Sequence, residues 1–220
     1  MKARLYSELR RRSDAIWKRI FDHPFVRALY TGTLPLEKFK FYIVQDYNFL
    51  VAMMRVFSIM ASKADPSAAR KLLQVAYAEA TTEMDNYVKL LSKLKLSLDY
   101  VVSAEPAPTN LAYTSFLISS CSLGGVAECL SAVLPCFASY REIALRYKRE
   151  LESNPVELYK EWGSVYLSDE YASLVDSLVE IFEEQAQDNM LERYERLFRT
   201  ASRYEYMFWD MADRVEEWPV

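Results

Sequence analysis

Residues 133–140 read Val-Leu-Pro-Cys-Phe-Ala-Ser-Tyr, and they lie in the stretch of the chain that decides its fold. Apolar residues recur at spacings of three and four from Leu130 to Phe137, which is the pattern of one continuous helical face. Pro135 lies inside that pattern and has no N–H to donate to the carbonyl of Ser131, so we expect the helix to bend or loosen there. The wall of a pocket tolerates such a break well, because water or a ligand can bind the freed backbone groups.

Cys136 follows the proline, and two interpretations of this cysteine are open. Free cysteine is among the most buried residue types, so the simpler interpretation is a thiol packed in the core of a bent helix. The alternative is a reactive thiol on the wall of a pocket, with Tyr140 one turn further along the same helical face. The stretch by itself favours the buried, structural cysteine.

The composition of the whole chain indicates an all-α protein. Of its 220 residues about half are hydrophobic, and only four are glycine. Sheet-rich folds need glycine in their turns, whereas long helices do not. The length allows one large domain or two small ones. We expect a single domain over residues 1–220, because the pattern of paired helices continues on both sides of the longest connection, residues 95–110.

Charge and hydrophobicity exclude several classes of protein. A net charge of −4 argues against a nucleic-acid-binding surface. Residues 1–17 are too charged for the core of a signal peptide, and the longest apolar run, residues 126–138, is too short to cross a bilayer. We therefore expect a cytoplasmic protein that does not bind a membrane. Its three cysteines are expected to be free thiols, although a low content of Asn and Gln weakly indicates a thermophilic source, in which cytosolic disulfides are less unusual.

Capping and turn residues divide the rest of the chain into helices. The only histidine, His23, lies in a loop before Pro24, where a structural role is expected rather than a catalytic one. Asp65 before a proline is a typical N-cap. The expected helices cover residues 2–21, 35–62, 66–94, 113–123, the segment through residues 133–140, and residues 155–166, 168–187 and 190–215.

Two carboxylates lie among apolar residues on these helices. Asp46 shares a helical face with Phe49, and Glu205 precedes Phe208 and Trp209 by three and four residues. A carboxylate on a buried face needs a partner, such as an arginine, a tyrosine hydroxyl or a bound ligand. Burial would also raise the pKa of Glu205 and suit it to donate a proton near neutral pH.

Metal centres and phosphate-binding loops have no support in the sequence. One histidine is too few for a di-iron site, and Cys121, Cys129 and Cys136 are spaced by eight and seven residues, too far apart for a typical zinc site. A thiol, two carboxylates and 16 tyrosines remain. This set suits a flat, nitrogen-containing aromatic ligand, which stacks on rings and bonds to carboxylates through its nitrogens. The simpler interpretation of the aromatic residues is a helical core.

In combination, five motifs resemble those of the TenA (thiaminase II) family, in the family's order and over nearly the whole chain. The motifs are Asp22-His23-Pro24-Phe25, Leu34-Pro35-Leu36-Glu37-Lys38-Phe39, Gln45-Asp46-Tyr47, Leu134-Pro135-Cys136 with Tyr140, and Glu205 followed by Phe208-Trp209-Asp210-Met211-Ala212. The resemblance implies a single all-α domain of the haem-oxygenase-like kind, without haem, another cofactor or a metal. It also implies a homotetramer.

The activity that this resemblance implies is hydrolysis at the pyrimidine-methylene carbon of thiamin or of 4-amino-5-aminomethyl-2-methylpyrimidine, which yields hydroxymethylpyrimidine. By the same resemblance, Cys136 is the nucleophile, Glu205 protonates a ring nitrogen and Asp46 binds the amino group of the pyrimidine. The other matched residues form the substrate site, with Phe49 stacked on the ring, Tyr113 near the thiol, and Tyr140, Tyr166 and Phe208 in the pocket.

Two positions depart from the family pattern, and two other classes of function stay open. Phe49 stands where the family often has tyrosine, and Tyr87 where related sequences often have histidine. A non-catalytic binder would keep the aromatic residues and Asp46 without turnover. A haem enzyme of the same fold would need an axial ligand, for which His23 in its loop is badly placed.

Overall fold

The computed structural model describes residues 4–220, apart from the side chains of residues 79 and 82–86. Over this range the chain forms helices and no strand, which confirms the all-α prediction. The α-helices are α1 Arg4–Arg12, α2 Asp14–Phe21, α3 Pro24–Thr31, α4 Leu36–Ala61, α5 Pro66–Ala80, α6 Thr82–Leu94, α7 Leu98–Ser103, α8 Pro108–Leu123, α9 Val126–Arg146, α10 Lys148–Glu152, α11 Glu157–Ser164, α12 Asp169–Gln185 and α13 Leu191–Arg214. Two 3-10 turns, η1 Val165–Leu167 and η2 Asp188–Met190, precede α12 and α13.

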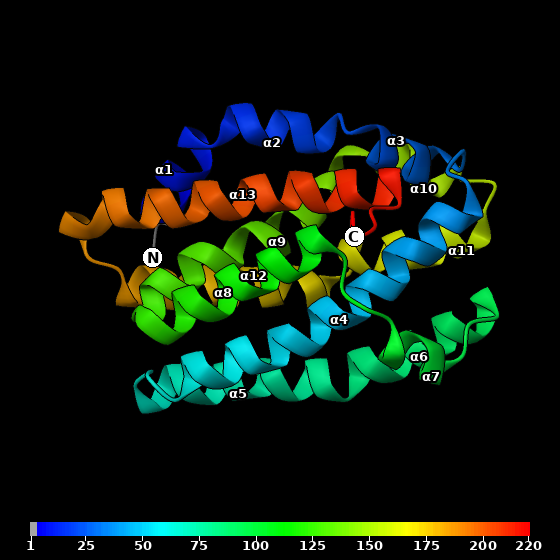
Figure 1. The fold of residues 1–220 in the computed structure, drawn as a ribbon. Helices are drawn as coiled ribbons and strands as arrows, with labels where there is room; N and C mark the ends of the chain where they lie inside the picture. Colours follow the sequence, from blue (N-terminus) through cyan, green and yellow to red (C-terminus); the bar gives the residue numbers. More distant parts are fainter. Residues whose placement is uncertain (1–3) are drawn as a thin grey trace.

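The long helices pack side by side around one hydrophobic core. α13 lies along α9, α12 packs on α9, and α4 packs on both α5 and α8 (Figure 1). The core runs from Leu5 in α1 to Ala212 in α13, and its largest fully buried side chains include Trp17 and Trp209. Burial of these apolar faces, rather than helix propensity alone, stabilises helices of this length.

One predicted helix cap, Asp65, is confirmed, and His23, for which a structural role was predicted, is a second cap. The Asp65 carboxylate accepts hydrogen bonds from the backbone N–H groups of Ser67 and Ala68, at 2.9 and 3.2 Å, at the start of α5. His23 Nδ1 accepts from the backbone N–H of Phe25 at 3.2 Å and so caps α3. Each residue precedes a proline in the first helical turn, where the missing N–H costs nothing.

Several helix boundaries differ from the prediction. The helix expected over residues 2–21 is two helices that meet at Ser13, and this break allows Leu9 of α1 and Trp17 of α2 both to be fully buried. The helix expected over residues 66–94 is divided at Thr81. The short helices α7 and α10 were not expected, because five or six residues carry too little hydrophobic periodicity to identify.

The prediction of three free thiols is wrong for two of the cysteines. Cys121 near the end of α8 and Cys129 at the start of α9 form a disulfide, with their Cα atoms 4.6 Å apart. Gly124 and Gly125 separate the two helices, and the reversal of the chain there brings cysteines eight residues apart face to face. Cys136 is not disulfide-bonded, as predicted.

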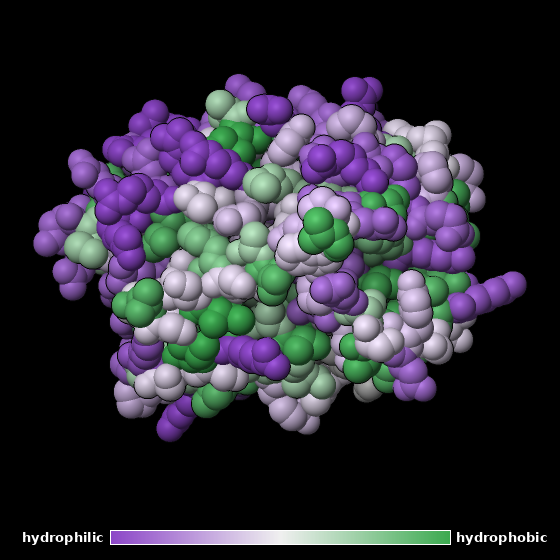
Figure 2. Space-filling view, viewed as in Figure 1, coloured by the Kyte–Doolittle hydropathy of each residue, from purple (hydrophilic) through white to green (hydrophobic). Residues whose placement is uncertain are grey.

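The outer surface is polar over α13 and the N-terminal helices and more mixed over α4, α5 and α8 (Figure 2). Exposed apolar side chains include Leu73 and Tyr77 on α5. None of the helices that the structure describes combines the length and apolar character that a membrane span requires.

Candidate active site

A cavity of about 680 Å³ lies between α4, α5, α8, α9, α12, α13 and the η1 turn. Its size is within the range of small-molecule sites in proteins. All eight residues predicted for the substrate site line it, namely Asp46, Phe49, Tyr113, Cys136, Tyr140, Tyr166, Glu205 and Phe208. These residues come from four long helices and one short turn, so the fold brings together positions that are up to 162 residues apart in the sequence (208 − 46).

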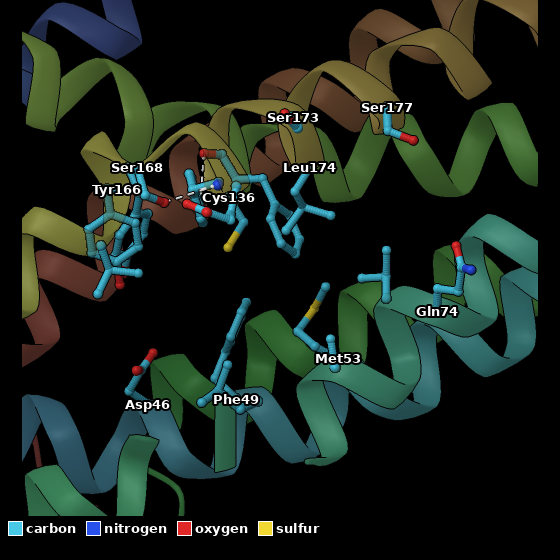
Figure 3. Close-up of a pocket in the computed structure, with 18 of the residues that line it drawn as sticks. Asp46, Phe49, Met53, Gln74, Cys136, Tyr166, Ser168, Ser173, Leu174 and Ser177 are labelled. Atoms are coloured by element: carbon cyan, nitrogen blue, oxygen red, sulfur yellow. Dashed lines mark hydrogen bonds between the residues drawn. The ribbon is translucent and has the colours of Figure 1, made fainter. Parts of the chain in front are cut away.

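Helical spacing explains why each helix contributes the residues that it does. In α4, Asp46, Phe49 and Met53 follow one another at intervals of three and four residues and therefore share one face. Cys136 and Tyr140 in α9 have the same relationship, one turn apart. Cys136 points into the cavity from one wall, and Asp46 and Phe49 rise from the wall opposite (Figure 3).

Cys136 lies on the pocket wall and not in the core. Its side chain is half-buried, whereas the core residues Val133 and Leu134 before it in α9 are fully buried. Residues 126–146 stay in one helix through Pro135. The structure therefore favours the second interpretation of this cysteine, a thiol accessible to a ligand.

Glu205 is buried beside the thiol and holds three hydrogen bonds. The Tyr113 hydroxyl donates to Glu205 Oε1 at 2.5 Å, the Ser139 hydroxyl lies 3.5 Å from Oε2, and the Cys136 thiol is also bonded to this carboxyl. Burial raises the pKa of Glu205 to about 7, and the three hydrogen bonds oppose that rise. This direction agrees with the prediction from burial, and a pKa in this range makes the carboxyl able to give or take a proton near neutral pH.

Ser139 is a site residue that the sequence analysis missed. It lies three residues after Cys136 in α9 and is fully buried, and its hydroxyl also contacts the Cys136 carbonyl at 3.3 Å. Nothing in its own stretch of sequence distinguishes it, because its importance depends on Glu205, which lies opposite it on α13.

Aromatic rings form a slot between the two carboxylates. The ring of Phe49 lies 5.2 Å from that of Tyr113 and 5.5 Å from that of Phe208, and the rings of Tyr140 and Tyr166 lie 4.9 Å apart. These are edge-to-face or tilted contacts, which leave ring faces available for stacking. A flat heteroaromatic ligand between these walls would present its edges to polar groups.

Asp46 is half-buried, and three tyrosines lie near enough to respond to its charge. Tyr42, which the sequence analysis did not select, lies with its hydroxyl 3.0 Å from that of Tyr140. Burial, and after it the negative charge of Asp46, raises the pKa of Tyr42, Tyr140 and Tyr87. Of these groups, the Asp46 carboxylate and the Tyr140 hydroxyl belong to residues that line the cavity, and they can form hydrogen bonds with a ligand at this end.

Tyr87 lies near Asp46 but does not line the cavity. Its side chain is buried, its ring lies 5.8 Å from that of Tyr47, and its hydroxyl has no hydrogen-bond partner among the residues that the structure describes. The structure therefore places this departure from the family pattern beside the Asp46 end of the cavity.

The cavity continues past Cys136 between α5 and α12. Gln74 and Ala78 line it from α5, and Ser173 and Ser177 line it from α12 (Figure 3). Beyond them, Lys71 of α5 reaches Glu180 of α12 at 3.7 Å. The space available therefore exceeds that of a single six-membered ring at the thiol.

His23 does not take part in the cavity. It is buried, its Nε2 lies 3.8 Å from a carboxylate oxygen of Asp210, and burial lowers its pKa. Its role as the cap of α3 confirms the structural assignment, and it leaves His23 poorly suited as an axial ligand to haem. Within residues 4–220 as described, no cluster of three or more His, Cys, Asp or Glu side chains is arranged to hold a metal ion.

Comparisons with known proteins agree with this geometry. A model of the TENA/THI-4/PQQC family matches residues 10–214. A protein named aminopyrimidine aminohydrolase from Halalkalibacterium halodurans is 32% identical over 216 residues, which cover 96% of each chain. A solved TenA homologue from P. horikoshii OT3 superposes with a TM-score of 0.93 at 46% identity, covering 96% of this chain and 98% of that one. A domain with a heme oxygenase-like fold from Shewanella denitrificans, 12% identical, superposes with a TM-score of 0.79 over 96% of this chain and 92% of that one, which confirms the predicted fold.

Proposed function

Because this chain belongs to the TENA/THI-4/PQQC family, we propose that it is a hydrolase of thiamin salvage that acts at the pyrimidine-methylene carbon. Its substrate is thiamin or 4-amino-5-aminomethyl-2-methylpyrimidine, and its product is hydroxymethylpyrimidine. The observation that carries the proposal is the pairing in one cavity of a free thiol, Cys136, with a carboxyl, Glu205, whose pKa is raised to about 7. A nucleophile beside a group that exchanges protons near neutral pH is the arrangement that covalent catalysis requires.

Substrate binding follows from the two ends of the aromatic slot. The Asp46 carboxylate accepts hydrogen bonds from the amino group of the pyrimidine, and the ring stacks against Phe49. Glu205 reaches a ring nitrogen from the other side. A ring held in this way presents its carbon atoms to the Cys136 sulfur, which points into the same space.

The first chemical steps use the contact between Cys136 and Glu205. Glu205 transfers its proton to the ring nitrogen, which makes the pyrimidine electrophilic. The thiol gives its proton to the Glu205 carboxylate as the sulfur adds to a ring carbon, so the net proton movement is from sulfur to nitrogen. Cys136 therefore needs no histidine, because the carboxyl that activates the ring also accepts the thiol proton.

The dearomatised ring then expels the leaving group from the exocyclic methylene carbon. With the aminomethyl substrate the amino group takes up a proton and leaves as ammonia, whereas thiamin releases its thiazole without one; in both cases water adds to the methylene carbon and loses a proton. The carbon–sulfur bond then breaks and aromaticity returns, while the proton on the ring nitrogen goes back to the thiolate through Glu205. The balance is the replacement of the amino group, or of thiazole with release of one proton, by a hydroxyl group, and no oxidant or reductant is consumed.

The test is turnover of both substrates by wild type and by Cys136→Ala, with the product identified by mass. Loss of the covalent step should reduce kcat by about three orders of magnitude or more, which is about 4 kcal/mol of barrier. The matched control is the Cys121→Ala/Cys129→Ala double variant, which removes the disulfide outside the cavity and should keep most of the activity. Near-normal turnover by Cys136→Ala would show that Cys136 is not the nucleophile. Tight binding of either substrate without turnover by wild type would show that the protein is a non-catalytic binder.

We also propose that residues 1–220 form one domain that assembles as a homotetramer and works in the cytoplasm. One continuous hydrophobic core supports the single domain. Exposed Leu73 and Tyr77 on α5 supply apolar area that a partner copy would cover. Light scattering of the purified protein, compared with that of a Leu73→Glu variant, tests the assembly.

A further inference from the structure

Helix α8, which carries Tyr113, begins without a side-chain cap of its own. Its N-cap residue is Ala107, and Pro108 follows in the first turn. The first N–H groups of a helix have no partner within the helix and need one from outside. Two side chains from other parts of the chain supply it: Gln45 Oε1 accepts from the Ala107 N–H at 2.8 Å, and Glu216 Oε2 accepts from the Thr109 N–H at 2.8 Å.

Both carboxylate oxygens of Glu216 are engaged at this helix end. Oε1 accepts from the Thr109 hydroxyl at 3.0 Å, and a negative charge at a helix N-terminus is favoured by the helix dipole. The Glu216 side chain is only 19% exposed, whereas the neighbouring Glu217 is exposed. A further bond runs from the Trp218 indole N–H to the Pro106 carbonyl at 3.1 Å. The residues that follow α13 are thus fastened to the start of α8.

The turn that directs Glu216 toward α8 is strained. Val215 has φ 51° and ψ 59°, in the left-handed region that a β-branched residue rarely adopts. The Glu216 N–H bonds to the Met211 carbonyl at 3.0 Å and closes the turn. A backbone cost of this kind persists only where later contacts compensate for it, and it points to a function for the contacts that follow.

Helices α8 and α13 are also in contact at the candidate active site. Tyr113 lies one turn beyond Thr109 in α8, and its hydroxyl donates to Glu205 of α13 at 2.5 Å. In the part of the chain that the structure describes, the side-chain hydrogen bonds between α8 and residues 191–216 are those of Thr109 with Glu216 and of Tyr113 with Glu205. The bonds to Glu216 are therefore the side-chain hydrogen bonds between these two described segments that lie outside the site itself.

We propose that Glu216 is a positioning residue for the reaction: its carboxylate caps α8 and holds this helix in register with α13, so that the Tyr113 hydroxyl reaches Glu205. The inference rests on the proposed function for the role of Glu205 in turnover, although the hydrogen bond that it concerns is measurable without substrate.

Loss of this alignment between α8 and α13 should change the pKa of Glu205 in a predictable direction. The bond from Tyr113 stabilises the ionised form of Glu205 and lowers its pKa against the effect of burial, so a longer or absent bond raises the pKa. The titratable groups that face Glu205 are Tyr113 from α8 and Cys136 and Tyr140 from α9, while Asp46 of α4 lines the same cavity. Of these, only Tyr113 is on the helix that Glu216 caps.

The experiment is an infrared difference titration of the Glu205 carboxyl band, identified by its loss in Glu205→Gln, with pH–rate profiles recorded in parallel. Glu216→Ala should move the midpoint upward by about 0.5 to 1 pH unit, the equivalent of one weakened hydrogen bond, and the alkaline limb of the rate profile should move with it. Glu216→Gln keeps an acceptor for the Thr109 N–H and should restore the wild-type midpoint. Glu217→Ala is the matched control and should leave the midpoint unchanged.

Two further variants keep the test decisive. If Glu216→Ala does not fold, Thr109→Val removes one of the two bonds at nearly constant volume and should give a smaller shift of the same sign. Val215→Gly relieves the strained turn and keeps the carboxylate, so it should raise Tm without moving the midpoint.

An unmoved Glu205 midpoint in Glu216→Ala or in Thr109→Val, whatever happens to Tm, would reduce Glu216 to a purely structural cap and overturn the proposal. If the Glu205 midpoint shifts in Glu216→Ala but wild type turns over neither substrate, the positioning role of Glu216 is supported and the proposed function is wrong.

Discussion

Replacing Glu205 with glutamine should make the protein more stable at alkaline pH while it abolishes turnover. Burial raises the pKa of Glu205 from 4.5 to about 7, so the native state binds the proton more tightly than the unfolded chain does. For a group whose folded-state pKa is raised, the associated stability is present below the unfolded pKa and is lost as pH rises through the folded one. The relevant window is therefore from about pH 4.5 to pH 7.

The size of the effect follows from the same two values. A shift of about 2.5 pKa units corresponds to roughly 3 kcal/mol of destabilisation once Glu205 is ionised in both states. Glutamine keeps the shape, can still accept the Tyr113 hydroxyl bond and carries no charge. Its advantage over wild type should be less than about 1 kcal/mol at pH 5 and about 3 kcal/mol at pH 8.

Urea unfolding of both proteins at these two pH values measures the difference, provided that unfolding is reversible. In thermal scans the same advantage corresponds to about 5 to 10 °C in Tm at pH 8. Glu217→Gln, at an exposed position on the same side of the molecule as the end of α13, is the control and should show no growing difference. A constant stability difference between pH 5 and pH 8 would show that the pKa of Glu205 is not raised, and the proton path through Glu205 would then lose its basis.

Three other predictions concern the site and the helices that hold it. Asp46→Asn should weaken aminopyrimidine binding by about tenfold to a hundredfold, because a charge-assisted hydrogen bond is lost, and leave Tm nearly unchanged; equal affinities by calorimetry would return Asp46 to a structural role. Lys63→Met should lower the free energy of unfolding by about 1 kcal/mol, since the Lys63 ammonium donates to three carbonyl groups at the end of α8, at 2.6, 2.6 and 2.9 Å. Joint replacement of Cys121 and Cys129 by alanine should cost about 2 to 3 kcal/mol for a loop of this size, and a reductant that lowers the Tm of wild type but not of the double variant would confirm it.

Much of the fold could be predicted from local patterns in the sequence. The scarcity of glycine, the three- and four-residue spacing of apolar side chains and caps such as Asp65 each act within a turn or two of helix, and the structure confirms the helices that they predicted. The divisions at Ser13 and Thr81 were missed, because both segments keep helical periodicity across the break. Packing against neighbouring helices, and not local preference, decides where such a long segment changes direction.

The site residues likewise fall into those that local sequence signals identified and those that only the structure revealed. Cys136, Glu205 and Asp46 were selected from their unusual places in apolar helices and from motif order, and the structure brings them into one cavity. Ser139 and Tyr42 have no such local signal, because they matter only for what stands opposite them: a carboxyl of α13 in one case and a hydroxyl of α9 in the other.

The sequence by itself determined the class of fold, the helical faces and the identity of the reactive groups, since these depend on residue type and on spacing within one helix. Only the tertiary structure decided the pairing of Cys121 with Cys129, the hydrogen bonds that Glu205 receives from Tyr113 and Ser139, and the capping of α8 by Glu216. Each of these depends on distances between segments remote in sequence or on the loss of water around a charge. Burial and long-range geometry arise only when the helices pack together.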